Sequence, residues 1–143
     1  MNTIQLKQNE NTSKIPTKGS SSSAGHDLYA SQSFTIPPGT TVQIPTGISI
    51  AIPEGYFGGI FARSGLATKQ GLRPANCVGI IDSDYRGEII VPLYNDSKES
   101  KIINIYDRIA QLIIIPYYIF DWEIVKTLSS TKRGDGGFGS TGV

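Results

Sequence analysis

The sequence predicts an all-β domain, a β-sandwich or jelly roll with one short helix. Apolar and polar residues alternate over several short runs, and Pro and Gly separate these runs. Ile48, Ile50 and Ile52 show the alternation most clearly, between Pro-Thr-Gly and Pro-Glu-Gly turns. No long amphipathic helices lie between the runs. Many short strands without long helices are typical of these two architectures.

The expected strands follow one another along most of the chain. Residues 3–7 carry Ile4 and Leu6 in alternation, and residues 18–25 form a flexible, serine-rich connector. Further strands are expected within 34–55, 76–81, 88–95, 101–119 and 122–128. Residues 82–87, between two of these runs, are expected to form the wide polar tip of a hairpin. The one expected helix spans Ser64 to about Gln70.

Length and composition narrow the class of protein. A chain of 143 residues fits one domain, and a net charge of +1 gives no broad surface for nucleic acid. The N-terminal residues have no apolar signal core, and no run is long and apolar enough to span a bilayer. The single cysteine, Cys77, excludes an intrachain disulfide. We therefore expect a cytoplasmic protein that binds neither nucleic acid nor membrane.

The glycine-rich C-terminus reads RGDGGFGSTGV. Its Gly-x-Gly-x-x-Gly pattern lacks the strand–turn–helix context of a dinucleotide-binding loop, and its Arg-Gly-Asp is too short a match to indicate adhesion. We expect a β-domain over 1–128 and a mobile arm over 129–143, because the arm has one large apolar residue, Phe138. Fully extended, fifteen residues reach roughly 50 Å, enough to cross to another subunit.

Four stretches before the tail could carry chemistry, and each has a structural alternative. Asp82 and Asp84 could be catalytic carboxylates or part of a solvated turn. Arg63 and Ser64 could bind an anion at a helix N-terminus, or Ser64 could simply be the N-cap.

Arg108 and Gln111 fit the exposed face of an ordinary strand. His26, the only histidine, is adjacent to Asp27. With a single histidine, a Ser-His-Asp triad or a zinc site has little support, and a packing role is preferred.

Together, the five stretches from AGHDLYA to RGDGGFGSTG resemble the trimeric dUTPase family, in the same order and with fitting spacing. The resemblance implies a jelly-roll homotrimer whose active sites are shared between chains. It also implies hydrolysis of dUTP to dUMP and pyrophosphate, by Mg²⁺-assisted attack of water at the α-phosphate. Such an enzyme keeps uracil out of DNA and supplies dUMP for thymidylate synthesis.

The resemblance implies roles for the residues that would bind the nucleoside. Asp82 matches the carboxylate that holds the attacking water. Tyr85 matches the ring that packs under the deoxyribose and excludes a 2′-hydroxyl. The uracil edge would be read by Asn76 and by the backbone of Gly79, Ile80 and Ile81.

Other matching residues would bind the triphosphate. Gln111 and the motif Arg63, Ser64 and Gly65 match phosphate-binding positions. Asp27 matches a residue near Mg²⁺, through water, while the triphosphate holds most of the metal. Arg108 would support the carboxylates from behind.

The tail would complete the site. Arg133, Gly139, Ser140 and Thr141 match residues that wrap the γ-phosphate, and Phe138 matches the ring that stacks on uracil. Two positions depart from the family, which often has Tyr at His26 and Pro at Ala62. Neither is expected to take part in the chemistry.

Two alternative functions remain at this point. A dCTP deaminase-related enzyme would share the fold, but it would need a catalytic glutamate and a cytosine pocket that have no clear match here. A non-catalytic, nucleotide-dependent regulatory protein would keep the motifs for binding only. A second, protein-binding role is compatible with either activity.

Overall fold

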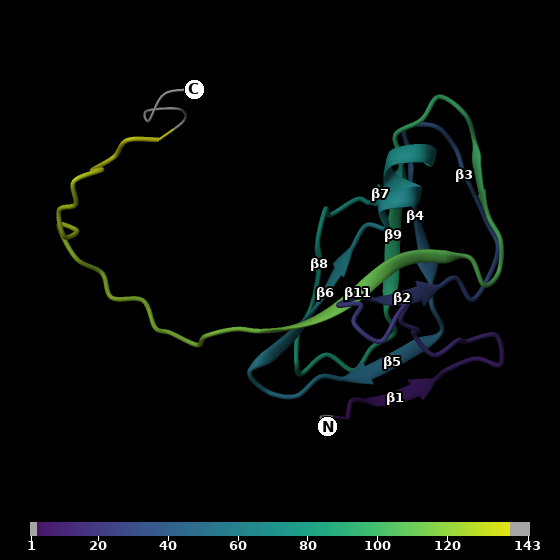
Figure 1. Cartoon of the computed structure of the whole chain (residues 1–143), viewed down its shortest axis with the longest axis horizontal. Helices are drawn as coiled ribbons and strands as arrows, with labels where there is room; N and C mark the ends of the chain where they lie inside the picture. The colour runs from purple at the N-terminus through teal and green to yellow at the C-terminus, as the bar shows by residue number, and fades with distance from the viewer. Residues whose placement is uncertain (1–2, 138–143) are drawn as a thin grey trace.

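The computed structural model describes residues 3–137, and antiparallel strands make up most of its regular structure (Figure 1). One short helix covers residues 64–70, in which Ser64 and Gly65 form an α-helical start that continues as η1 (Leu66–Gln70). The all-β class and the short helix are therefore confirmed. The strands are β1 (Gln5–Gln8), β2 (His26–Tyr29), β3 (Phe34–Ile36), β4 (Thr41–Pro45), β5 (Ile48–Ala51), β6 (Tyr56–Phe61), β7 (Leu72–Pro74), β8 (Gly79–Ile81), β9 (Ile90–Asn95), β10 (Lys101–Ile103) and β11 (Arg108–Pro116).

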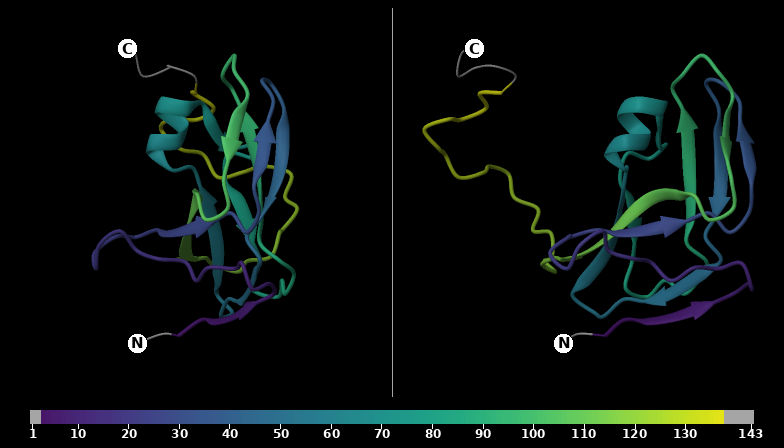
Figure 2. Two further views of the ribbon diagram at one scale, coloured as in Figure 1. Left: turned by 90° about the vertical axis from the view of Figure 1, so that its right-hand side faces the viewer. Right: turned by 45° about the vertical axis from the view of Figure 1, so that its right-hand side comes forward.

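Two larger sheets and two strand pairs build the body (Figure 2). One sheet has the order β2-β11-β6-β8 and the other the order β4-β9-β7, while β1 pairs with β5 and β10 with β3. In the first sheet, Gln111 of β11 is the register partner of both Asp27 and Phe61. This register matters for the site because it places three candidate segments on neighbouring strands.

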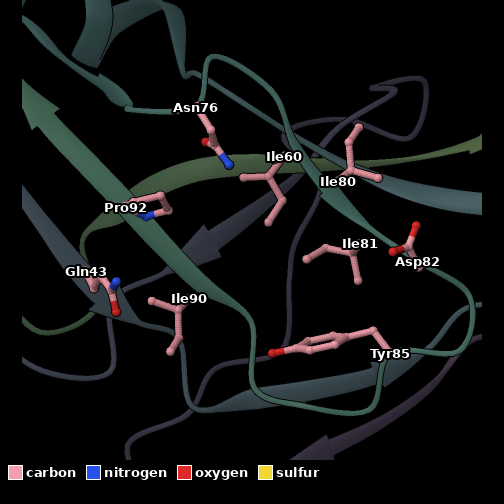
Figure 3. Close-up of a pocket in the computed structure, with 10 residues that line it drawn as sticks. Gln43, Ile60, Asn76, Ile80, Ile81, Asp82, Tyr85, Ile90 and Pro92 are labelled. Atoms are coloured by element: carbon pink, nitrogen blue, oxygen red, sulfur yellow. The ribbon is translucent and has the colours of Figure 1, made fainter.

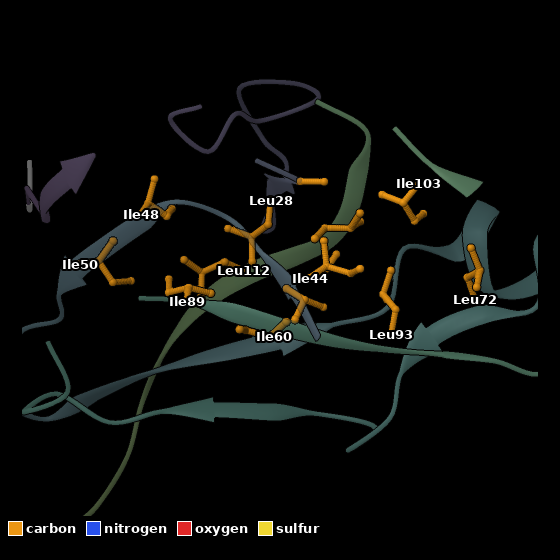
Figure 4. Close-up of a cluster of buried hydrophobic side chains, with 14 of the residues drawn as sticks. Leu28, Ile44, Ile48, Ile50, Ile60, Leu72, Ile89, Leu93, Ile103 and Leu112 are labelled. Atoms are coloured by element: carbon orange, nitrogen blue, oxygen red, sulfur yellow. The ribbon is translucent and has the colours of Figure 1, made fainter. Parts of the chain in front are cut away.

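The core takes alternate residues from both larger sheets and from β5 (Figure 4). Ile48 and Ile50 of β5 are buried, as their period-two spacing predicts. Leu28 and Leu112 from the first sheet share the same cluster with Leu93 from the second. Each such side chain contributes roughly 1.5–3 kcal/mol through burial. The alternation in the sequence thus identifies the inward faces correctly.

Strand β6 contains two glycines that close packing requires. A Cβ on Gly58 would lie 2.9 Å from Ile52 Cδ1 and 3.0 Å from Leu112 Cδ1. A Cβ on Gly59 would lie 2.6 Å from the Phe61 ring. Glycine normally weakens a strand, so this central strand was not recognised from the sequence.

Two expectations about strands are wrong. Residues 82–87 are not a hairpin tip, because β8 pairs with β6 whereas β9 pairs with β4 and β7. The segment crosses from one sheet to the other. Residues 122–128 form no strand, because no partner strand lies beside them in the single chain. Alternation identifies the faces of a strand but not its partner.

The chain leaves the body after β11 and continues as an extended arm, here residues 117–137 (Figure 1). Its apolar side chains are exposed: Trp122 is 88% exposed and Ile124 is 99% exposed. The predicted boundary near residue 128 therefore lies within this arm rather than at the end of the last strand. Within residues 3–137, no helix has the length and hydropathy that crossing a bilayer requires.

Candidate active site

A cavity of about 350 Å³ brings together the residues expected to bind a nucleoside (Figure 3). We call it the Asp82 pocket. Asp82 and Tyr85 come from the crossover after β8, and Asn76 comes from the turn before it. Ile60, Ile90, Pro92 and Gln43 also line the cavity, although no sequence pattern marks them as site residues. The full lining consists of Gln43, Ile60, Asn76, Gly79, Ile80, Ile81, Asp82, Tyr85, Ile90 and Pro92.

Strand β8 presents backbone groups to this pocket. It is the edge strand of its sheet and pairs only with β6, through Gly79↔Ile60, Ile80↔Gly59 and Ile81↔Gly58. An edge strand leaves a row of N–H and C=O groups on its outer side. Such groups can hydrogen-bond the polar edge of a planar base, while Ile60 and Pro92 provide apolar walls.

The crossover loop is held in shape by its own hydrogen bonds. The Tyr85 N–H donates to the Asp82 carbonyl at 3.2 Å. The Arg86 guanidinium donates to the Ser83 carbonyl at 2.7 Å and to the Tyr85 carbonyl at 2.9 Å. Arg86 therefore turns back onto its own loop and leaves Asp82 and Tyr85 to face the pocket.

A second, polar pocket collects the expected phosphate-binding residues, and we call it the Arg63 pocket. It is lined by Asp27, Arg63, Ser64, Gly65, Arg108 and Gln111, together with Ile113 and residues of the 19–25 loop. Strands β2, β11 and β6 bring these residues together, through the Asp27↔Gln111↔Phe61 register. The Gln111 amide donates to the Ala62 carbonyl at 2.8 Å, which fixes the approach of the chain to Arg63.

Asp27 lies between two guanidinium groups. Arg63 Nε donates to Asp27 Oδ1 at 2.9 Å, and Arg108 Nη1 donates to Asp27 Oδ2 at 3.4 Å. Arg63 Nη1 also donates to the Arg108 carbonyl at 3.3 Å. Within residues 3–137, Arg63 Nε and Nη1 both donate hydrogen bonds, whereas Nη2 has no hydrogen-bond partner. A fixed guanidinium loses less entropy on binding than a mobile one.

Helix η1 is not capped by a side chain. The helical segment already starts at Ser64, and Gly65 is helical, with φ −64° and ψ −39°. The interpretation of Ser64 as the N-cap is therefore wrong. Ser64 lines the Arg63 pocket instead, which agrees with the anion-binding alternative.

The two pockets have no lining residue in common. Within residues 3–137 of one chain, Asp82 and Arg63 therefore lie in separate cavities. Arg133 lines neither pocket, and its Nε donates to the Gly136 carbonyl at 2.8 Å within the arm. Phe138, Gly139, Ser140 and Thr141 lie outside the described residues.

The described residues do not form a metal site by themselves. They contain no group of three or more His, Cys, Asp or Glu side chains that could hold an ion. Both oxygens of Asp27, the residue expected near Mg²⁺, already accept guanidinium hydrogen bonds.

His26 lies on β2, beside Asp27. Burial, and after it the positive charge of Lys18, lowers the pKa of its imidazole below the ordinary value. The ring is thus neutral at neutral pH. It lines neither pocket, which supports the packing role over a catalytic one.

Comparison with known proteins places this arrangement in a family. The family model of the dUTPases matches residues 11–142. The deoxyuridine 5′-triphosphate nucleotidohydrolase of Desulfitobacterium hafniense is 47% identical over 150 residues, covering 100% of this chain and 99% of that protein. The corresponding protein of Rickettsia massiliae is 49% identical over 143 residues, covering 98% and 97%.

Solved structures share the fold. The G164S mutant of the dUTPase of Staphylococcus bacteriophage 80alpha, with dUpNHpp, is 27% identical, with a TM-score of 0.93 over 100% of both chains. A dUTPase variant from phage phi11 of S. aureus, described for its structural Mg(II) ion, is 24% identical and has a TM-score of 0.84, covering 90% of this chain and 100% of that chain. The expected jelly roll is confirmed. The chain belongs to the dUTPase family, and it is a dUTP diphosphatase that hydrolyses dUTP to dUMP and pyrophosphate.

Proposed function

We propose that dUTP is hydrolysed in active sites that different copies of this chain share within a homotrimer. The observation that carries this proposal is the separation of the Asp82 pocket from the Arg63 pocket. A dUTP molecule needs a nucleoside site and a triphosphate site in contact. Two copies can meet this need by placing the Asp82 pocket of one against the Arg63 pocket of the next.

The Asp82 pocket binds the nucleoside in this proposal. Asn76 and the outer backbone edge of β8 hydrogen-bond the uracil edge. Such matched donors and acceptors would leave the amino group of cytosine mispaired, which discriminates more strongly than size. The Tyr85 ring packs under the deoxyribose and leaves no room for a 2′-hydroxyl.

Asp82 orients the attacking water and accepts its proton. A carboxylate is a weak base, so orientation of the water is its main contribution. Phosphoanhydride hydrolysis depends chiefly on in-line positioning and on neutralising charge. Attack at the α-phosphorus follows from the place of Asp82 beside the sugar-binding Tyr85.

The Arg63 pocket binds the phosphates. Arg63 is held by Asp27 with Nη2 left for a phosphate oxygen, and Ser64, Gly65 and Gln111 provide further donors. Arg108 supports the same carboxylate. Mg²⁺ would arrive with the triphosphate, with Asp27 near it only through water.

The arm supplies the last part of the site. Tyr118, Phe120, Trp122, Ile124 and Leu128 alternate along it, and all are exposed. The first four lie two residues apart, and Ile119 between them is exposed as well. An extended segment with exposed apolar side chains favours addition to a sheet of a second copy. The residues beyond, from Arg133 to Thr141, would then close over the site of a neighbour.

We also propose a cytoplasmic location, as the composition suggests.

A mixing experiment tests the shared site. Asp82→Asn and Arg63→Ala chains are each expected to form inactive homotrimers. When they are co-expressed and purified through two different tags, only mixed trimers remain, and about a third of their sites regain both wild-type residues. Pyrophosphate release from dUTP should therefore reappear.

If Asp82 and Arg63 acted within one chain, every mixed site would lack one of them. Mixed trimers as inactive as both parents would thus contradict the proposal. A parallel assay with dCTP, dTTP and UTP, with and without Mg²⁺, tests the base and sugar selectivity and the metal requirement.

A further inference from the structure

The Tyr85 side chain is held at its hydroxyl end by two neighbouring residues. Its hydroxyl donates to the Glu88 carbonyl at 3.0 Å. Its ring also lies so close to Gly87 that a Cβ at that position would collide with the ring and its hydroxyl oxygen. Figure 3 shows the ring along one wall of the Asp82 pocket. The position of Tyr85 therefore depends on where the backbone of Gly87 and Glu88 is fixed.

The Glu88 side chain provides that fixed point. Its Oε1 accepts a hydrogen bond from the Gly47 N–H at 2.7 Å, across to the turn between β4 and β5. Gly47 has φ +69°, and a Cβ there would collide with Ser13. The buried Ser13 hydroxyl in turn donates to the Gly47 carbonyl at 2.6 Å. Glu88 is thus bound to a turn with little freedom to move.

The residue after Glu88 belongs to the same rigid part. Ile89 is fully buried, and its carbonyl accepts the Thr46 hydroxyl at 2.6 Å. Its N–H donates to the Ile48 carbonyl at 2.9 Å. By contrast, residues 84–87 are exposed. The exposed loop that carries Tyr85 is therefore anchored to the core through Glu88 and Ile89.

We propose that Glu88 is a positioning residue that fixes the Tyr85 ring and thereby sets the preference of the enzyme for deoxyribose over ribose. The inference rests on the proposed function, in which Tyr85 packs under the sugar. Glu88 itself does not line the Asp82 pocket. The Glu88 carboxylate accepts a hydrogen bond from the Gly47 N–H, and the Glu88 carbonyl accepts one from the Tyr85 hydroxyl. If the ring were displaced, the pocket would have room for a 2′-hydroxyl.

The test compares kcat/KM for dUTP and for UTP. Wild type must first prefer dUTP, and Tyr85→Ala must reduce that preference; if it does not, the proposed placement of Tyr85 fails. With that established, Glu88→Ala should lower the dUTP/UTP ratio about tenfold, within the range of about 10–200-fold that shape-based selection supplies. Glu88→Gln keeps an oxygen acceptor for Gly47 and should restore most of the ratio.

The matched control is Glu99→Ala. Glu99 is an exposed glutamate whose carboxylate reaches only Lys101, at 3.7 Å, and its removal should leave the ratio unchanged. A Glu88→Ala enzyme with a wild-type ratio, while Tyr85→Ala remains sensitive, would overturn the inference and leave the proposed function standing.

Gly87→Ala covers the case in which Glu88→Ala does not fold. This change keeps the Glu88–Gly47 bond but forces the Tyr85 ring to move, so the ratio should again fall. An unchanged dUTP/UTP ratio in a folded Gly87→Ala enzyme would contradict the proposal that the position of the Tyr85 ring sets this ratio.

A double-mutant cycle gives a stricter test, because Tyr85→Phe removes only the hydroxyl that donates to the Glu88 carbonyl. Its effect on the ratio should largely vanish in the Glu88→Ala background if the two residues act through each other. Two independent effects that multiply would contradict the inference.

Discussion

The Asp82 pocket and the Arg63 pocket are built by different interactions. Backbone hydrogen bonds and apolar side chains such as Ile60 and Pro92 shape the first. Ion pairs among Asp27, Arg63 and Arg108 shape the second. The first therefore selects by fit and by matched donors, which salt hardly affects, whereas the second selects by charge, which salt screens. A nucleotide is recognised by shape at one end and by charge at the other.

The largest expected effect comes from the one carboxylate in the pocket that selects by shape. Asp82→Asn should lower kcat by about 10²–10⁴-fold, because the water loses its oriented acceptor. Binding of dUTP should remain near wild type, since the walls are unchanged. Pyrophosphate release and calorimetric titration measure the two quantities. Near-normal turnover would remove Asp82 from its role.

The next effect concerns the segment expected to join the two pockets. Deletion of residues 133–143 should leave a folded trimer, because the core contains none of them. Activity should fall by about 10²-fold, as the γ-phosphate and base would lose their cover. Light scattering checks the trimer, and steady-state kinetics check the rate. Wild-type rates in the truncated protein would exclude a lid.

Asp27→Asn tests whether the Arg63 pocket binds its ligand mainly through charge. Without the carboxylate, Arg63 and Arg108 lose their common partner and repel each other, so KM for dUTP should rise about tenfold, the worth of one charge-assisted hydrogen bond. KM should also rise more steeply with salt than in wild type. If the variant instead recovers the wild-type KM at saturating Mg²⁺, Asp27 acts on the metal and does not act by holding the two arginines.

Phe138→Ala tests stacking on the base that the Asp82 pocket holds. Affinity for a non-hydrolysable dUTP analogue should weaken by about 1–3 kcal/mol, the usual worth of base–aromatic stacking. Titration calorimetry on variant and wild type gives this difference directly. Unchanged affinity would mean that the ring does not stack.

The smallest effect belongs to His26, on the strand that carries Asp27. Burial and Lys18 lower the pKa of the folded-state imidazole, so the unfolded chain binds a proton more readily. Its contribution to stability is therefore present above about pH 6.5 and is lost as the pH falls through the lower folded pKa. Thermal unfolding at pH 5 and pH 8 should show a smaller pH dependence in His26→Tyr than in wild type.

The inward faces of the strands and the functional motifs could be predicted from the sequence better than the pairing of the strands. Ile48, Ile50 and Ile52 alternate with the small residues Ser49 and Ala51, and burial of the isoleucines follows directly from that period. The partners of β8 and β9 could not be predicted in the same way, because a strand with one apolar face fits any sheet that buries this face. Strand β6 was missed because its two glycines resemble a turn until Ile52 and Leu112 are seen against them.

The site shows the same limit. Asp82, Tyr85 and Arg63 belong to recognisable motifs, and the chain resembles dUTPases through them. Ile90 and Pro92 could not be selected, since an apolar residue that lines a cavity has the same pattern as one that fills the core. The separation into two pockets was equally invisible, because order along the chain carries no information about which copy completes a site.

The arm also contains a residue whose intrinsic fluorescence can report on its surroundings. Trp122 is the only tryptophan of the chain, and it lies on the exposed apolar face of the arm, with its ring 5.6 Å from that of Phe120. Docking of this face on another copy would transfer the indole from water to an apolar contact. Its emission should then shift to shorter wavelength, so that dilution followed by fluorescence would report trimer dissociation without any attached label.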